Sequence, residues 1–171
     1  MCDYKKIFKN ILAQNNNHSK WNSGDYKDIK RLANTKVGDV GEEFIVKVCE
    51  ELNIPYEFPL NKEGKHSRTS PWDIKINGIC FELKTATEDI HGSFQFNHIR
   101  YHREYDAVLC LGVSPSSLQF DLWSKADVVT GKAGKLVTME KGANASYKLT
   151  KKKDKLFDIE EFEMKIKSFS L

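Results

Sequence analysis

Residues 70–84 read SPWDIKINGICFELK, and this stretch decides the fold. Apolar and polar residues alternate on both sides of Asn77-Gly78, and that dipeptide is a strong signal for a two-residue hairpin turn. We therefore expect strands over Trp72–Ile76 and Ile79–Leu83, joined as a β-hairpin. The face expected to be buried carries Ile74, Ile76, Ile79, Phe81 and Leu83.

The turn also fixes which residues of the hairpin face each other. With Asn77-Gly78 as its two central residues, Asp73 faces Glu82 across the strands. Lys84 follows Glu82 by two positions and therefore lies on the same face. Opposed carboxylates destabilise a sheet unless a cation or a raised pKa compensates for the repulsion. A hard cation such as Mg²⁺ beside a lysine is equipment for metal-assisted hydrolysis of phosphodiesters.

The same spacing has a simpler interpretation. The segment is then a surface hairpin in which Lys84 neutralises two acidic side chains. Asp, Glu and Lys are common residues, so the pattern D-x₈-E-x-K also arises by chance. Taken alone, the pattern favours the structural interpretation, and the surrounding sequence has to decide between the two.

Other segments predict an α/β fold. Apolar residues recur at helical spacing from Val37 to Leu52, and Asn53 and Pro55 follow them, which indicates an amphipathic helix. The continuous apolar run AVLCLGV at 107–113 is typical of a strand buried on both faces. Further helices are expected over 4–12, 25–33 and 156–169, and further strands over 56–58, over 118–123 and within 131–150.

These elements suggest one domain with a mixed central β-sheet flanked by helices. We divide it into an N-terminal helical region (1–34), a catalytic core (35–125) and C-terminal strands with a helix (126–171). No internal repeat and no linker splits the chain.

The helix predicted over 37–52 carries an acidic residue in a notable position. Its apolar stripe centres near Phe44 and Val48, which places Glu42 at the edge of the stripe. Gly38 and Gly41 are unusual in this helix, because each costs ~1 kcal/mol relative to alanine. Close approach of another backbone or a ligand explains them, and so does an irregular helix start.

Four motifs follow each other in an informative order: Gly38-Asp39-Val40-Gly41-Glu42, Ser70-Pro71-Trp72-Asp73, Glu82-Leu83-Lys84 and the stretch Gln95–Arg100. Over about residues 35–115 the chain resembles the PD-(D/E)XK nuclease superfamily, which includes type II restriction endonucleases and several repair nucleases. The last motif is similar to the Q-x-x-x-I-R stretch of some restriction-type members. One departure is Trp72, which turns the usual PD into PWD.

The resemblance implies a restriction-endonuclease-like core and a role for each motif residue. Asp73 and Glu82 would bind the metal ion, together with the backbone carbonyl of Leu83. Lys84 would position and polarise the attacking water, and Glu42 would support a second metal ion or the water network. The implied cofactor is Mg²⁺, with Mn²⁺ able to substitute.

A nuclease needs contacts to phosphates, and a sequence-specific one also needs contacts to bases. The candidates are Ser67, Arg68, Gln95, Asn97, His98, Arg100 and Arg103. Arginine suits guanine and asparagine suits adenine, although for each residue alone a solvated loop is at least as good an interpretation. By resemblance, Gln95 would also help to shape the site. The lysines at 151–153 and 155 fit either a DNA contact or, preferably, the solvated start of the final helix.

We therefore expect a Mg²⁺-dependent, type II site-specific deoxyribonuclease of a restriction system, acting on double-stranded DNA. A homodimer would supply one active site per strand, because a palindromic site mirrors two-fold symmetry. Two alternatives stay open. One is a structure-specific repair or recombination nuclease of the same superfamily, and the other is a non-catalytic DNA-binding module.

The composition of the chain excludes several other classes of protein. The 171 residues include 27 Lys and Arg against 24 Asp and Glu, a net charge of +3, which argues against a histone-like packaging protein. No apolar stretch is long enough for a membrane span and no secretory signal is visible, so we expect a cytoplasmic protein without a membrane partner. The sequence contains no Walker A motif, so we expect no nucleotide cofactor. Cys2, Cys49, Cys80 and Cys110 lack metal-site spacing and are expected to be mostly reduced core residues.

Overall fold

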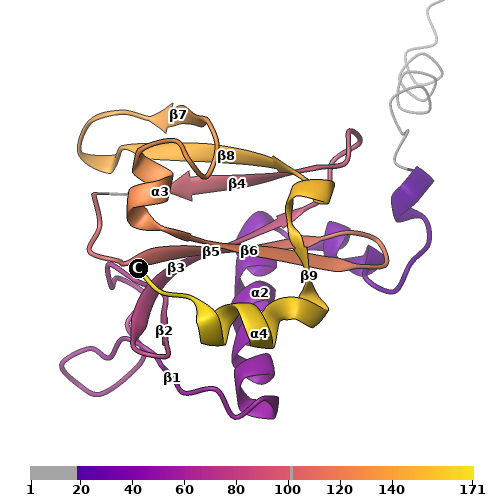
Figure 1. Cartoon of the computed structure of the whole chain (residues 1–171). Coiled ribbons are helices and arrows are strands. Elements are labelled where there is room, and N and C mark those ends of the chain that lie inside the picture. Colours follow the sequence, from indigo (N-terminus) through magenta and orange to yellow (C-terminus); the bar gives the residue numbers. More distant parts are fainter. Residues whose placement is uncertain (1–18, 101) are drawn as a thin grey trace, which may run out of the picture.

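The computed structural model describes residues 19–100 and 102–171 (Figure 1). Its helices are η1 (Ser19–Trp21), η2 (Lys27–Arg31), α2 (Asn34–Glu51), α3 (Lys125–Val129), η3 (Gly142–Asn144), η4 (Lys153–Lys155), η5 (Ile159–Glu161) and α4 (Phe162–Ser168). Its strands are β1 (Tyr56–Glu57), β2 (Ile74–Ile76), β3 (Ile79–Thr87), β4 (Ser93–Ile99), β5 (Ala107–Val113), β6 (Leu118–Ser124), β7 (Leu136–Glu140), β8 (Ser146–Lys152) and β9 (Phe157–Asp158).

The larger sheet has six strands in the order β1-β2-β3-β5-β6-β9. The central strands β3 and β5 run parallel, and all other neighbours run antiparallel. Helices α2 and α4 pack against it through a core that includes Ile45, Phe81, Leu109 and Phe162. The expected fold, a mixed central β-sheet flanked by helices, is confirmed.

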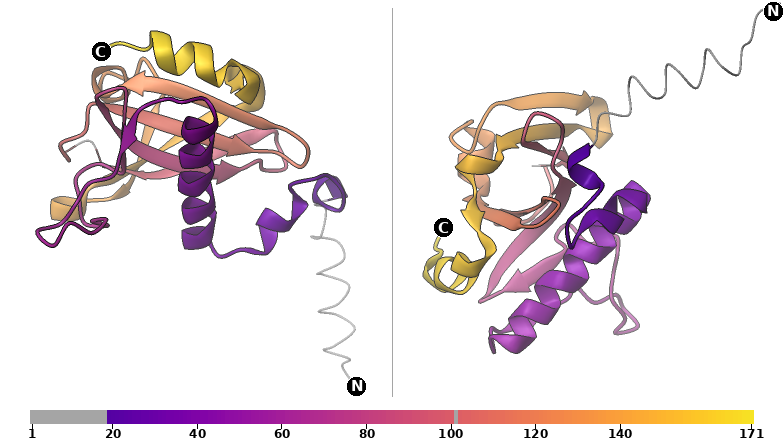
Figure 2. Two further views of the ribbon diagram at one scale, coloured as in Figure 1. Left: turned by 90° about the horizontal axis from the view of Figure 1, so that it is seen from below. Right: turned by 90° about the vertical axis from the view of Figure 1, so that its right-hand side faces the viewer.

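A second sheet of three antiparallel strands, in the order β4-β8-β7, lies over the other face of the larger one. Figure 2 shows the two sheets facing each other, with β4 following β3 through a turn. The core between them includes Phe94, Phe96, Val108, Cys110 and Leu149. The strands that the sequence predicted within 131–150 belong to this sheet.

The predicted hairpin has the expected register. Ile74 pairs with Phe81 and Ile76 pairs with Ile79, around the turn at Asn77-Gly78. The first strand starts at Ile74 rather than at Trp72, and the second continues to Thr87. The apolar run 107–113 forms β5, which is buried along its whole length as predicted.

Helix α2 presents a slightly different face from the expected one. Gly41, Ile45 and Cys49 are buried, whereas Phe44 and Val48 are only partly buried. The reason is the close approach of β3 to Gly41, which turns the helix toward its glycine side. The stripe therefore centres one residue later than the apolar spacing predicted.

Two expectations for the C-terminal part are wrong. The segment 156–169 is not one helix, because Phe157 pairs with Phe120 at the edge of the larger sheet and the α-helix begins only at Phe162. The lysines at 151 and 152 belong to β8 rather than to a helix start, since β8 pairs with β4 there, and 153–155 form a 3₁₀ turn.

Two helices were expected in the N-terminal region, and the described residues include only one of them. The helix expected over 25–33 is a 3₁₀-helix at Lys27–Arg31, and the helix expected over 4–12 lies outside the described residues.

The described cysteines Cys49, Cys80 and Cys110 are free thiols, and two of them are buried. Within the described part of the chain, no helix is both long and apolar enough to cross a membrane.

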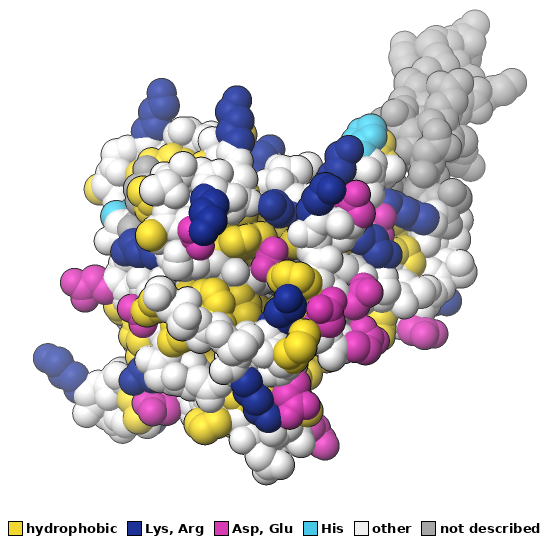
Figure 3. All heavy atoms as spheres, viewed as in Figure 1, with side chains coloured by type: hydrophobic (Ala, Val, Ile, Leu, Met, Phe, Trp, Pro, Cys, Tyr) yellow, Lys and Arg dark blue, Asp and Glu magenta, His cyan; other side chains and the backbone are white. Residues whose placement is uncertain are grey.

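Charged side chains are unevenly distributed over the viewed face of the molecule. Figure 3 shows Lys and Arg side chains projecting from the end that β7 and β8 form, whereas most acidic side chains lie nearer α4 and α2.

Candidate functional site

Strand β3 carries two charged residues into the interior. Glu82 pairs in register with Val108, and Lys84 pairs with Cys110. Both partners belong to the core between the two sheets, so Glu82 and Lys84 share the face that looks toward the small sheet. This agrees with the prediction that they lie on one face.

Glu82 and Lys84 form a close ion pair. Glu82 Oε1 lies 2.7 Å from Lys84 Nζ, and the two side chains are 3% and 21% exposed. The N–H of Arg100 donates to Glu82 Oε2 at 3.5 Å. Oε1 is buried and accepts no well-oriented hydrogen bond among the described residues, so it keeps acceptor capacity. A charge this deeply buried persists only when it is paired.

Asp73 comes directly before β2 and binds the edge of β3. Its N–H donates to the carbonyl of Phe81 at 2.9 Å, and its Oδ2 accepts the N–H of Leu83 at 2.8 Å. The strand ladder ends with the pair of Ile74 and Phe81. The expected direct pairing of Asp73 with Glu82 is therefore replaced by a carboxylate bound to the amide of the next residue along β3.

Glu42 lies on α2, half-buried, with its Oε1 3.7 Å from His66 Nε2. Burial raises the pKa of the Glu42 carboxyl; His66 and Arg68 oppose this shift, and the carboxylates of Asp73 and Asp39 add to it. Asp73 is therefore close enough to act on the pKa of Glu42, so helix α2 and the segment before β2 both contribute acidic residues to this region.

Gly41 explains how the helix comes so close to β3. A Cβ atom at Gly41 would lie 1.8 Å from Thr85 Oγ1, whereas one at Gly38 would have no neighbour within 4 Å. Close approach of a neighbouring element therefore accounts for Gly41. It also sets the distance of Glu42 from the sheet.

A cleft of about 400 Å³ opens beside Lys84. Strand β2 pairs only with residues 79–81, so beyond Leu83 this edge of β3 has no strand partner in the described ranges. The start of α2 and strand β4 form the other walls. Gln95, Asn97 and His98, three of the predicted DNA contacts, line this cleft.

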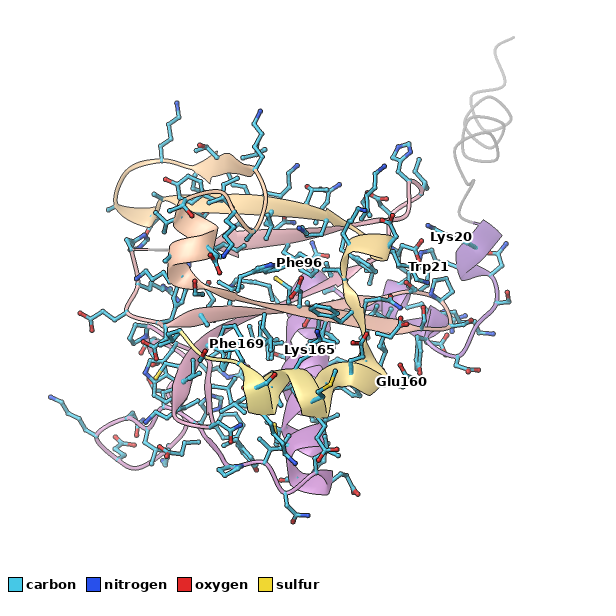
Figure 4. All side chains as sticks on the ribbon, in the orientation of Figure 1. Lys20, Trp21, Phe96, Glu160, Lys165 and Phe169 are labelled. Carbon is cyan, nitrogen blue, oxygen red and sulfur yellow. The ribbon has the colours of Figure 1, made fainter. Side chains whose placement is uncertain are left out.

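Strand β4 divides its residues between the core and the cleft. Phe94 and Phe96 are fully buried, and Figure 4 shows Phe96 in the space between the two sheets. The alternating Gln95 and Asn97 are exposed and line the cleft. At the far end of the cleft lies Asp89. Burial raises the pKa of its carboxyl, but hydrogen bonds from two backbone amides and Gln95 bring the pKa below its usual value.

The end of β4 is held by an interaction that the sequence did not suggest. His98 has a positive φ of 59° at an irregularity of the strand. Its Nδ1 lies 3.5 Å from Glu140 Oε2, and Arg100 Nη2 donates to the same oxygen at 3.5 Å. The buried Ser146 donates its hydroxyl to Glu140 at 2.6 Å and lowers the pKa of that carboxyl. Glu140 thus joins β7 and β8 to the end of β4 beside Glu82.

The remaining predicted DNA contacts lie outside this cleft. Arg68 is 82% exposed, 3.9 Å from Asp39, and lines a neighbouring cleft of about 400 Å³ together with Glu42. Ser67 shares a hydrogen bond with Thr69 in the loop before β2. Arg103 lies in the turn after β4 and is not among the residues lining either cleft. The structure brings Arg68 and Glu42 together, but it does not bring Arg103 to them.

The acidic residues suit Mg²⁺ through their chemistry. Asp73 and Glu82 offer hard oxygen atoms from adjacent segments, and Mg²⁺ commonly uses one or two carboxylates and several waters. The buried Glu82 Oε1 has acceptor capacity left for a cation. No group of three or more His, Cys, Asp or Glu residues within 19–100 and 102–171 forms an all-protein metal cage. The carbonyl role of Leu83 stays a prediction.

Comparisons with known proteins do not assign the chain to a family. No family model and no curated protein matches the sequence. A solved structure of a bacterial homing endonuclease, I-Ssp6803I, matches with a TM-score of 0.43 and 12% sequence identity. The match covers 76% of this chain and 84% of that chain.

Proposed function

We propose that the protein is a metal-dependent endonuclease of the PD-(D/E)XK type that hydrolyses phosphodiester bonds in double-stranded DNA. One observation carries the proposal: the buried pair of Glu82 and Lys84 lies on one face of β3. Asp73 accepts a hydrogen bond from the amide of Leu83, which lies between Glu82 and Lys84 in the sequence, and Lys84 lines the cleft. A structural ion pair needs neither the third acidic residue nor the cleft.

The chemistry follows from these positions. Mg²⁺, when bound, would supply charge stabilisation for the phosphate and acidify a water molecule. Asp73 and Glu82 would hold the cation through their carboxylate oxygens. Lys84 orients the attacking water or stabilises the charge that develops on the phosphate. Burial raises the pKa of Glu42, and a cation bound nearby would lower that pKa and favour the carboxylate.

We assign the substrate contacts to the walls of the cleft. Gln95, Asn97 and His98 carry donors and acceptors suited to bases and phosphates. Arg100 is bound to Glu140 and contacts phosphate once that bond is exchanged. A type II restriction enzyme acting as a homodimer is the specific form we propose, since one chain carries one such site.

Cleavage of a long defined duplex in Mg²⁺ or in EDTA tests the proposal, with the ends mapped by sequencing. We expect discrete Mg²⁺-dependent fragments that share one end sequence, and no cutting by Asp73→Ala. The matched control is Glu43→Ala, an exposed acid on α2, which should cut like the wild type. Cleavage that persists in Asp73→Ala with Mg²⁺, or in EDTA, would reject the mechanism.

A further inference from the structure

The small sheet differs in charge from the rest of the molecule. Its strands carry Lys148, Lys151 and Lys152, and Glu140 is the one acidic residue in these three fully described strands. Glu140 is already engaged by Arg100 at 3.5 Å. The sheet therefore has positive charge that its own residues do not compensate.

Strand register decides where this charge points. Thr150 is exposed and pairs with Gln95 of β4, whereas the adjacent Leu149 is fully buried in the core. Lys148 and Lys152 lie two positions on either side of Thr150. The alternation of side chains along a strand therefore places both on the outward face of the sheet.

These two lysines are available to an external anion. Neither Lys148 nor Lys152 has a hydrogen-bond, ion-pair or cation–π partner among residues 19–100 and 102–171. Lys151, by contrast, points inward: its Nζ donates to the carbonyl of Ala133 at 2.7 Å and lies 5.2 Å from the ring of Trp123. Lys152 follows Lys148 by four positions along the strand, which separates their Cα atoms by roughly 13 Å.

The outward face is continuous with the cleft. Gln95 and Asn97 belong to this face and also line the cleft beside Lys84. Adjacent strands lie ~4.8 Å apart, so the lysines of β8 stand one strand away from the cleft wall. Beyond them, on β7, Val137 leaves 47% of its surface exposed. No described element covers this face, and Figure 3 shows basic side chains projecting there.

We propose that duplex DNA lies along this outward face as it enters the cleft, with Lys148 and Lys152 on its phosphates. Duplex DNA carries one negative charge per ~1.7 Å of its axis, so two lysines in a row along a strand both reach phosphates. Thr150, between the two lysines, and Gln95, on the neighbouring strand that lines the cleft, offer hydrogen bonds to the same molecule. This inference rests on the proposed function and names the surface that holds its substrate.

The test measures binding of the full chain to a 40-base-pair duplex in EDTA over a series of salt concentrations. Each phosphate contact contributes about −0.9 to the slope of log K against log salt. The variant Lys148→Gln/Lys152→Gln should therefore have a slope shallower by about 1.8. The matched control Lys47→Gln/Lys167→Gln removes two exposed lysines from α2 and α4 and should leave the slope unchanged.

Each result separates this inference from the nuclease proposal. The inference is overturned if the wild type and the Lys148/Lys152 variant have equal salt slopes. It is also overturned if the slope decreases equally in that variant and in the Lys47/Lys167 control, even if Mg²⁺-dependent cleavage is found. Lysine-dependent binding without any cleavage supports the surface and rejects the nuclease. No binding to duplex DNA overturns the surface. The last outcome concerns a dimer that forms in the absence of DNA. If Val137→Asp dissociates that dimer and leaves DNA binding unchanged, the face binds a second copy of the chain instead.

Discussion

The pair of Glu82 and Lys84 links stability to chemistry at the scale of single residues. The carboxylate is 3% exposed, and Lys84 Nζ lies 2.7 Å away. Removing one partner of a buried pair leaves the other charge uncompensated, whereas removing both charges is often nearly neutral. Mutation can therefore separate the structural contribution of this pair from the catalytic role that we propose for it.

Lys84→Met should lower the free energy of unfolding by about 3 kcal/mol, the lower end of the range for a broken buried pair, because Lys84 is 21% exposed. Glu82→Gln/Lys84→Met should recover most of that loss. Neither variant should cleave DNA. Urea denaturation and a cleavage assay measure the two effects. If the double variant cleaved DNA, the pair would be structural only.

Asp121 provides a second prediction, on pH. Burial raises the pKa of its carboxyl from 3.8 to about 6, and the Leu122 N–H, Lys151 and Lys165 oppose the shift only partly. The folded state therefore holds this proton more tightly than the unfolded state. Stability falls as the pH rises from about 4 through about 6, and then the loss stays constant.

Asp121→Asn should remove that loss. The variant should be more stable than the wild type at pH 8, by at most about 3 kcal/mol, and nearly equal to it at pH 3. Urea denaturation at several pH values measures this difference. The control Asp154→Asn changes an acid that is 70% exposed and should show little pH-dependent difference. A parallel pH profile for wild type and Asp121→Asn would contradict the prediction.

At the scale of elements, the contact of α2 with β3 depends on one glycine. A Cβ atom at Gly41 would lie 1.8 Å from Thr85 Oγ1 and 2.8 Å from Thr85 Cβ, so the helix would have to move outward. Glu42 would move with it. Gly38, one turn earlier on the same helix, has open space around it and offers a matched comparison.

Gly41→Ala should lower the free energy of unfolding by about 1–3 kcal/mol, because overpacking outweighs the better helix propensity of alanine. Gly38→Ala should raise it by up to about 1 kcal/mol. Thermal or urea denaturation of both variants is the measurement. Equal effects of the two substitutions would mean that α2 does not pack on β3 at Gly41.

The sequence predicts local pairing better than it predicts long-range pairing. The Asn77-Gly78 turn and the alternation around it were enough to give the register of β2 with β3, and hence the common face of Glu82 and Lys84. The prediction of one helix over 156–169 was wrong because Phe157 pairs with Phe120 of β6, which is distant in the sequence, and so forms part of strand β9. Helical spacing carries no information about such a partner.

The site shows the same division. The common face of Glu82 and Lys84 could be placed from spacing alone. The position of Asp73 could not, because the strand ladder ends at Ile74 and Phe81 and the carboxylate binds the amide of Leu83 instead. Glu140 could not, because it meets Arg100 only when β7 and β8 fold against β4. Nothing local marks Glu140 as a neighbour of the residues beside β3, and only the observed strand order reveals it.

At the scale of the whole molecule, one chain has one set of Asp73, Glu82 and Lys84 on one edge of β3. If the protein is the nuclease that we propose, cutting both strands of a duplex requires two chains, or one chain acting twice. If a homodimer is the active form, wild-type protein should convert supercoiled plasmid directly into linear DNA. Mixing it with excess Asp73→Ala should instead yield nicked circles, because most wild-type chains then pair with an inactive one. Gel electrophoresis of the plasmid forms distinguishes these products.

If excess Asp73→Ala only slowed cleavage and linear DNA stayed the product, each chain would cut both strands independently. The two-fold arrangement would then be ruled out, although the assignment of the reacting residues would stand.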